Sequence, residues 1–130
     1  MGVPVAKEGD QVVGLDTHIL MVPSPGGPVP TPTPMPFSGK LDGELSSSVF
    51  IDNKAAAVKG STATNQPAHI PTAGPFQKPP ADKGTVDAGS DTVLFDGKPA
   101  ARMGDQVKTC NDPSDAPNGV IIATGTVMAN

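Results

Sequence analysis

Glycine and proline are so frequent in this chain that a mainly α-helical fold is excluded. The 130 residues include 15 glycines and 16 prolines, about twice the usual combined share of roughly 12%. Both residues destabilise helix interiors, and proline also removes a backbone donor. No segment shows a 3.6-residue apolar repeat over three turns. We therefore predict an all-β fold of short strands, hairpins and loops.

The apolar content is too low for a large hydrophobic core. The chain contains four Phe, no Trp and no Tyr. A domain of this length with so thin a core needs an additional staple, such as a metal ion, a disulfide or a partner chain. Because Cys110 is the single cysteine, an internal disulfide is excluded. The sequence therefore predicts a metal ion or a partner as the staple.

Charge and hydropathy exclude several classes of function. The net charge is −4 and the nine basic residues are scattered singly, so a nucleic-acid partner is not expected. The longest apolar runs are far shorter than the roughly 18 residues of a membrane span. The first ten residues lack the basic and apolar regions of a signal peptide. We expect synthesis in the cytoplasm without a signal peptide.

A short sequence unit occurs three times along the chain. Residues 49–60 align with 93–104 at six identical positions, namely Val, Asp, Lys, two Ala and Gly. A partial third copy is found at the N-terminus, where 4–12 aligns with 99–107. Internal repeats of this kind indicate a structure built from equivalent units. We therefore predict pseudo-threefold symmetry within one chain.

Each full copy has the pattern of a β-hairpin. The runs 48–51 and 92–95 are rich in β-branched and aromatic residues, and each is followed by Asp-Asn or Asp-Gly. These pairs tolerate the positive φ angles of a two-residue type I′ turn. The strand after the turn is rich in Ala, which allows close approach of neighbouring strands. The apolar segment 119–128 is predicted to be a buried strand that is broken near Gly125.

Two proline-rich blocks separate the copies, at 23–36 and 67–80. Since proline cannot donate to a strand ladder, we expect polyproline II loops that run over the surface or along a sheet edge. An alternative is that the blocks are ligands for a peptide-recognition domain, but they lack a flanking basic residue.

The three best soft or borderline metal ligands of the chain follow the three copies at similar distances. His18 and His69 each lie nine residues after the Gly that closes their copy, and Cys110 lies six residues after Gly104. Pseudo-symmetric copies bring such residues together near the threefold axis. Two imidazoles and a thiolate suit Zn²⁺, so we predict a structural zinc site. The repeat units, extended to these ligands, are about 3–18, 48–69 and 92–110.

The identity of the fourth zinc ligand stays open at this stage. A structural zinc ion normally has four protein ligands, and Asp16, Asp112 or a water molecule could complete the set. Three ligands and a water are also typical of catalytic zinc, which needs a nearby base and a pocket. Asp112 or Asp115 could act as the base, but a chain so poor in aromatic residues offers little to form a cleft. We predict that the protein is not an enzyme and assign no catalytic residue.

The third copy resembles the PAAR-repeat family. Its sequence at 98–105, KPAARMGD, carries the family tetrapeptide at 99–102, followed by Gly-Asp and then a metal ligand. The block 22–37 is similar to the proline-rich loop of PAAR-like members. With the diverged copies near the N-terminus and at 55–60, the resemblance extends over essentially the whole chain and implies a single PAAR-like domain at 1–130.

The resemblance implies a fold, a function and a partner. The fold is a small β-rich cone whose point is held by zinc and whose broad base sits on a trimeric β-helical spike, one monomer per trimer. Such proteins cap and sharpen the spikes of contractile injection machines, including type VI secretion systems and phage-tail-like particles. The chain departs from the family pattern of three His and one Cys, because only His18, His69 and Cys110 match.

Further expectations follow from this resemblance. The cap travels with the particle, leaves the cell on firing and touches the target membrane only transiently. An effector cargo would be a separate chain. The alternative is a zinc-binding adaptor that recruits a partner through the proline-rich blocks. For spike docking we nominate the apolar positions of three strands, which are Val49, Phe50, Ile51, Val93, Leu94, Phe95, Val120, Ile121 and Ile122.

Overall fold

The computed structural model describes residues 2–130, which form strands, turns and loops and no helix. The predicted domain begins one residue earlier, at Met1, which lies outside the described residues. The expected all-β class is confirmed. Among residues 2–130, no helix is long and apolar enough to cross a membrane. The strands are β1 (Val3–Pro4), β2 (Gln11–Val22), β3 (Val29–Gly43), β4 (Phe50–Ile51), β5 (Lys54–Ala55), β6 (Thr62–Asn65), β7 (Lys83–Val86), β8 (Leu94–Phe95), β9 (Lys98–Pro99), β10 (Gln106–Thr109), β11 (Ala116–Ile122) and β12 (Met128–Ala129).

The centre of the molecule is a closed barrel of six antiparallel strands. Its order is β10-β11-β2-β3-β6-β7, and β7 pairs with β10 to close it. The barrel consists of three hairpins, β2-β3, β6-β7 and β10-β11, and each hairpin follows one copy of the repeat. The repeated sequence therefore generates pseudo-threefold symmetry in the barrel.

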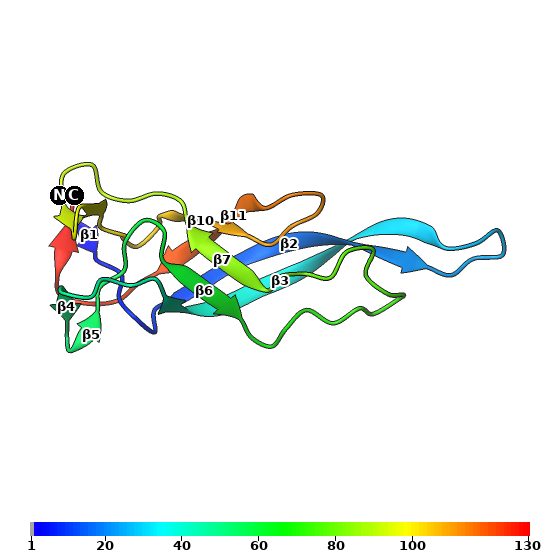
Figure 1. The fold of residues 1–130 in the computed structure, drawn as a ribbon, viewed down its shortest axis with the longest axis horizontal. Helices are drawn as coiled ribbons and strands as arrows, with labels where there is room; N and C mark the ends of the chain where they lie inside the picture. Colours follow the sequence, from blue (N-terminus) through cyan, green and yellow to red (C-terminus); the bar gives the residue numbers. More distant parts are fainter. Residues whose placement is uncertain (1) are drawn as a thin grey trace.

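One of the three hairpins is much longer than the others and gives the molecule its cone shape. β2 and β3 contain 12 and 15 residues, whereas β6, β7 and β10 contain four each. Figure 1 shows β2 and β3 continuing past the barrel to the narrow end, while both chain termini lie at the broad end. The narrow half is therefore built around a single hairpin.

Three small two-stranded sheets occupy the broad end. β4-β5 and β8-β9 are hairpins, and the third sheet pairs β1 with β12, so that it is divided between the two chain ends. In the two hairpins the predicted turns are confirmed, because Asp52, Asn53, Asp96 and Gly97 have φ angles of 52°, 66°, 54° and 79°. These positive values are those required by a type I′ turn.

A ring of backbone hydrogen bonds joins the three repeats. Ala6 N donates to Ala101 O at 2.9 Å, Ala101 N donates to Ala57 O at 3.0 Å, and Ala57 N donates to Ala6 O at 2.9 Å. All three side chains are fully buried. A larger side chain here would force the three segments apart, which explains the small residues at this position of every copy.

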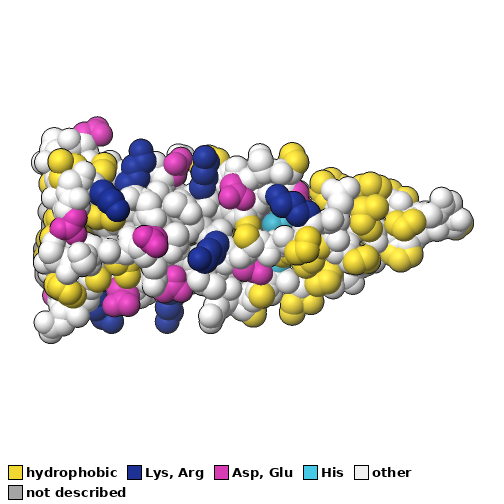
Figure 2. Space-filling model, in the orientation of Figure 1, with side chains coloured by type: hydrophobic (Ala, Val, Ile, Leu, Met, Phe, Trp, Pro, Cys, Tyr) yellow, Lys and Arg dark blue, Asp and Glu magenta, His cyan; other side chains and the backbone are white. Residues whose placement is uncertain are grey.

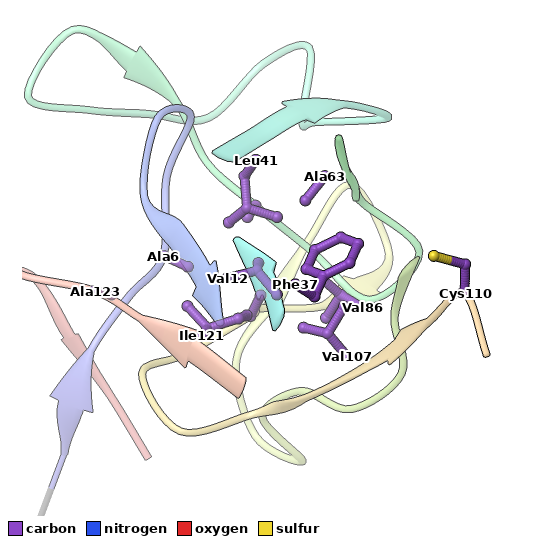
Figure 3. Packing of buried hydrophobic residues seen from close by; sticks show 12 residues of the cluster. Ala6, Val12, Phe37, Leu41, Ala63, Val86, Val107, Cys110, Ile121 and Ala123 are labelled. Carbon is purple, nitrogen blue, oxygen red and sulfur yellow. The ribbon is translucent and has the colours of Figure 1, made fainter. Parts of the chain in front are cut away.

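The apolar core is small and lies mainly inside the barrel. Figure 3 shows Phe37 packed near Val86 and Val107 from neighbouring repeats, with Cys110 at the margin of the cluster. A second cluster lies beneath the base sheets and includes Val5, Ile51 and Ala56. Each cluster draws on several repeats, so neither forms until the repeats have come together.

The first proline-rich block differs from the expected polyproline II loop. Residues 29–36 belong to β3 and pair with β2 along their whole length. The prolines occupy alternate positions, 30, 32, 34 and 36. In an antiparallel pair, alternate residues direct their backbone groups away from the partner strand. Proline is tolerated there because no donor is needed, and the strand forms despite four prolines in eight residues.

The apolar C-terminal segment is only half buried. The predicted break near Gly125 is observed, because β11 ends at Ile122 and β12 begins at Met128. Within β11, however, Ile121 is buried whereas Val120 and Ile122 are exposed. The segment therefore alternates between core and solvent, as expected for a strand on the wall of a barrel.

Candidate metal centre

The side chains of Asp16, His18, His69 and Cys110 meet where the barrel narrows. Asp16 and His18 lie on β2, His69 lies in the loop after β6, and Cys110 directly follows β10. One ligand atom from each side chain lies within 4.8 Å of the others. The structure thus brings together the three predicted ligands and selects Asp16, of the residues left open, as their neighbour.

The spacing within this cluster fits one tetrahedral metal ion. Asp16 Oδ2 lies 3.0 Å from His69 Nε2, 3.4 Å from Cys110 Sγ and 4.0 Å from His18 Nε2. Cys110 Sγ and His18 Nε2 are 3.7 Å apart. With metal–nitrogen bonds of about 2.1 Å and metal–sulfur bonds of about 2.3 Å, tetrahedral ligands lie about 3.3 to 3.6 Å apart. The four atoms therefore need only small shifts to share one ion.

The cluster is shielded from solvent, which determines its protonation. Asp16, His18 and Cys110 are buried, and the His69 side chain is only 3% exposed. Burial, followed by the charge of the Asp16 carboxylate, raises the pKa of the Cys110 thiol to about 12. Without a cation the cysteine is therefore a neutral thiol at pH 7. A bound divalent ion supplies the positive charge that stabilises the thiolate.

Charge balance also favours a divalent ion at this site. A thiolate and a carboxylate carry two negative charges, and two neutral imidazoles add none. A divalent cation makes the group neutral, which matters because an uncompensated charge in a buried site is costly. The residues of the cluster therefore fit a metal ion both in spacing and in charge.

Two neighbouring side chains orient the cluster. The Thr109 hydroxyl donates to Asp16 Oδ1, which leaves Oδ2 directed at the histidines and the cysteine. His18 Nδ1 is buried and has no hydrogen-bond partner among the described residues, and the nearest carboxylate oxygen is Asp112 Oδ2 at 3.6 Å. When Nε2 binds a metal, Nδ1 carries the proton and faces that oxygen, which is the arrangement by which carboxylates fix metal-bound histidines.

Asp112 is itself held in place by the backbone of β2. Its carboxylate accepts a hydrogen bond from Ile19 N at 2.9 Å, and its own N–H donates to Thr17 O at 2.8 Å. Asp112 was one of the residues predicted as a possible fourth ligand, and the structure places it behind His18 instead. Thr109 was not anticipated. Asp16 could have been favoured from the sequence, because residues two apart on a strand share a face.

Two pockets adjoin the cluster. One of about 50 Å³ is lined by His18 and Cys110, and one of about 340 Å³ is lined by His69. Asp115, which the sequence offered as a base, is exposed at the edge of the smaller pocket. The site can hold an ion that ties β2, the loop after β6 and the end of β10 together.

The nominated docking residues fall into four groups. Phe50 and Leu94 are exposed on the base hairpins, whereas Val49, Val93 and Phe95 are partly buried against the second cluster. Ile51 and Ile121 are buried in the cores and present no side chain to a partner. Val120 and Ile122 are exposed on the barrel wall, away from the base hairpins. The structure thus limits the base candidates to the exposed members and adds Met128 on β12.

A comparison with protein-family models finds a match in the C-terminal part of the chain. Residues 77–130 match the family model described as PAAR motif. This segment contains the third repeat copy and Cys110, whereas Asp16, His18 and His69 lie before it. No curated protein matches the chain.

Proposed function

We propose that this chain, a PAAR-repeat protein by the match of residues 77–130, forms the spike tip of a contractile injection system. It caps the blunt end of a trimeric β-helical spike and sharpens that spike for membrane puncture. One monomer covers one trimer, and the cap leaves the cell with the spike on firing. The observation that carries this proposal is the pseudo-threefold arrangement of the three sheets at the base, which suits a trimeric partner.

Each of the three sheets at the base presents at least one exposed apolar side chain. Phe50, Leu94 and Met128 begin β4, β8 and β12, and they are 61%, 58% and 54% exposed. Their pairing partners, Ala55, Pro99 and Pro4, are equivalent positions of the three repeat copies. Three equivalent apolar contacts suit the end of a homotrimer, whose exposed strand edges also need a cover.

The docking proposal is tested by the stoichiometry of the complex. The chain is mixed with the trimeric spike protein of its own injection system, and native mass spectrometry is expected to give one chain per trimer. Replacing Phe50, Leu94 and Met128 together by Glu is expected to weaken binding by at least about tenfold. The control is Ile70→Glu, which changes a residue of comparable exposure, 67%, in the loop beyond β6. Binding that is insensitive to the triple variant would contradict this surface.

We further propose that the metal is zinc and that Asp16, His18, His69 and Cys110 bind it. Zn²⁺ accepts imidazole, thiolate and carboxylate ligands in tetrahedral geometry. Elemental mass spectrometry of the purified protein is expected to find one zinc per chain, with loss of the metal in His69→Ala and Cys110→Ser. Asp115→Asn, which changes a nearby exposed carboxylate, is expected to retain it. A full zinc content in Cys110→Ser would contradict the ligand set.

The adaptor alternative receives less support. A polyproline II ligand must be free to enter a groove of its partner, whereas 29–36 is paired with β2. The second block at 67–80 also supports β2, because Pro75 O accepts a hydrogen bond from Met21 N and Gln77 N donates to Ile19 O. Recruitment through either block would require the narrow half to open.

A further inference from the structure

The outer face of the β2-β3 hairpin is a ladder of apolar side chains. On the inner face of this hairpin, Asp16, His18 and Leu20 are buried. The residues between them point outward and pair across the two strands. We call these four pairs the apolar ladder: Leu15 with Pro36, Thr17 with Pro34, Ile19 with Pro32, and Met21 with Pro30.

The narrow half that carries the ladder has very little charge. No Asp, Glu, Lys or Arg occurs between positions 17 and 39, or in the flanking loop at 66–77. Figure 2 shows the same division in space, with acidic and basic side chains over the broad half and apolar side chains over the narrow half. Leu15, Pro30, Pro32, Pro34 and Pro36 are exposed, and the other members of the ladder are half-buried.

The free edges of the hairpin offer almost no backbone donors. On β3, the outward-directed positions of this region are the four prolines, which have no N–H. On β2, the outward N–H groups of Thr17, Ile19 and Met21 donate to Asn111 Oδ1, Asp112 Oδ2 and Pro75 O, at 2.7, 2.9 and 2.8 Å. A further β-strand therefore finds no donors to pair with on either edge.

These features point to hydrocarbon rather than to a protein surface. A protein interface carries about one hydrogen bond per 100–200 Å², and Thr17 is the single polar side chain of the ladder. In a bilayer, by contrast, unsatisfied backbone groups and charges are the main costs, and the apolar ladder has no charged side chain. Among the described residues no donor pairs with the proline carbonyls on the β3 edge, which favours contact at the boundary of headgroups and acyl chains over deep burial.

We infer that the apolar ladder is a membrane-contact surface that inserts into the interface of a lipid bilayer. The inference rests on the proposed tip function and adds that the narrow half has lipid affinity of its own, without a spike or a contraction force. From Leu15 to Met21 the strand rises about 20 Å, which exceeds the roughly 15 Å hydrocarbon depth of one leaflet. The ladder is therefore long enough to reach the acyl chains while the charged half stays in water.

Co-flotation with vesicles of zwitterionic phosphatidylcholine tests the inference. The full-length, metal-loaded chain is expected to float with the vesicles. Leu15→Glu is expected to lower the bound fraction by about tenfold or more, because a charge replaces an apolar contact. Leu94→Glu is the matched control, because Leu94 on the base is also 58% exposed, and this variant is expected to float like the wild type.

The two surfaces can be separated in one set of variants. Leu15→Glu is expected to keep spike binding and to weaken lipid binding, whereas Leu94→Glu is expected to weaken spike binding and to keep lipid binding. Thermal melting and zinc content verify that each variant is folded, and Met21→Glu repeats the test at the far end of the ladder. If the wild type does not float, or if Leu15→Glu and Met21→Glu both float with it, the membrane-contact surface is wrong. Failure of spike binding alone would instead contradict the docking proposal.

Discussion

The broad and narrow halves of the cone are stabilised in different ways. In the broad half all three repeats contribute alike, and a ring of backbone hydrogen bonds through Ala6, Ala57 and Ala101 joins them. In the narrow half the first repeat alone supplies long strands. The other two repeats contribute loops and single side chains, among them His69 and Cys110. The broad half is thus stabilised by three equivalent repeats, whereas the narrow half depends mainly on the β2-β3 hairpin.

The two halves therefore differ in how much of the fold is lost when one link is broken. The ring connects segments from the whole chain, so its loss unfolds everything. The metal cluster connects three segments that have few apolar contacts with one another, so its loss should release the narrow half first. The narrow half of such a cone can be stable without a large core, because a bound ion replaces the missing apolar contacts.

Removal of the metal is expected to have the largest effect. At free metal a thousandfold above Kd, binding stabilises the fold by about 4 kcal/mol, so chelation should lower Tm by roughly 10 to 20 °C. Hydrogen exchange is expected to increase at Thr17, Ile19 and Met21, while the ring amides stay protected. Added zinc should restore both properties. Equal loss of protection in the ring would contradict the separation of the two halves.

A larger side chain in the ring is expected to have the next largest effect, in the opposite half. Ala57→Leu adds three carbons at a fully buried position, and such overpacking costs about 1 to 3 kcal/mol or more. Denaturant unfolding should show this loss in the metal-free and the metal-bound protein alike. Ala68→Leu makes the same change at an exposed position and should be nearly neutral. Equal stability of the two variants would contradict a role of the ring in holding the three repeats together.

Asp112→Asn is expected to weaken the metal site without affecting the barrel. The amide keeps an oxygen that can accept from Ile19 N, but it removes the charge that faces His18 Nδ1. Loss of such a partner lowers metal affinity about 10- to 100-fold. Competition with a chromophoric chelator measures the affinity, and Asp115→Asn is the control. If Asp112 served only to stabilise the fold, Asp112→Asn would change the Tm of the metal-free protein and leave its metal affinity the same.

The symmetric half of the molecule was accessible to sequence reasoning because its signals are local. Within each full copy the β-branched run and the Asp-Asn or Asp-Gly pair are adjacent in the sequence, and they predicted the hairpins and their turns. The in-phase positions of His18, His69 and Cys110 predicted the cluster without knowledge of the barrel. Local turn chemistry and repeat spacing depend little on distant packing.

The asymmetric half depended on tertiary context that no local pattern contains. The block at 29–36 is typical of polyproline II, and only its pairing with β2 converts it to a strand. The role of Asp112 behind His18 depends on the path of the loop after β10, and the burial of Ile51 and Ile121 depends on barrel closure. The split sheet β1-β12 joins residues from opposite ends of the chain, which a linear repeat cannot reveal.

The smallest expected effect on stability comes from changing Asp96, at the edge of the base. The Asp96 side chain accepts hydrogen bonds from the hydroxyls of Ser46 and Ser48 of the preceding repeat, with Ser46 Oγ at 2.6 Å. These bonds, that of Ser46 first, lower the pKa of the Asp96 carboxyl below its usual 3.8. The contact links two repeats, but it is exposed to solvent, so Asp96→Asn should lower Tm by only a small amount.

The pH dependence of this contact distinguishes it from a packing effect. A carboxyl whose pKa is lower in the folded state adds stability above its unfolded pKa and loses that contribution as the pH falls through the folded value. The Tm difference between wild type and Asp96→Asn should therefore be constant above about pH 5 and vanish on acidification below the lowered pKa. Asp52→Asn, at the equivalent turn position, lacks such serine partners among the described residues and serves as the control. A difference that persists at low pH would assign Asp96 to turn geometry instead of to the link between repeats.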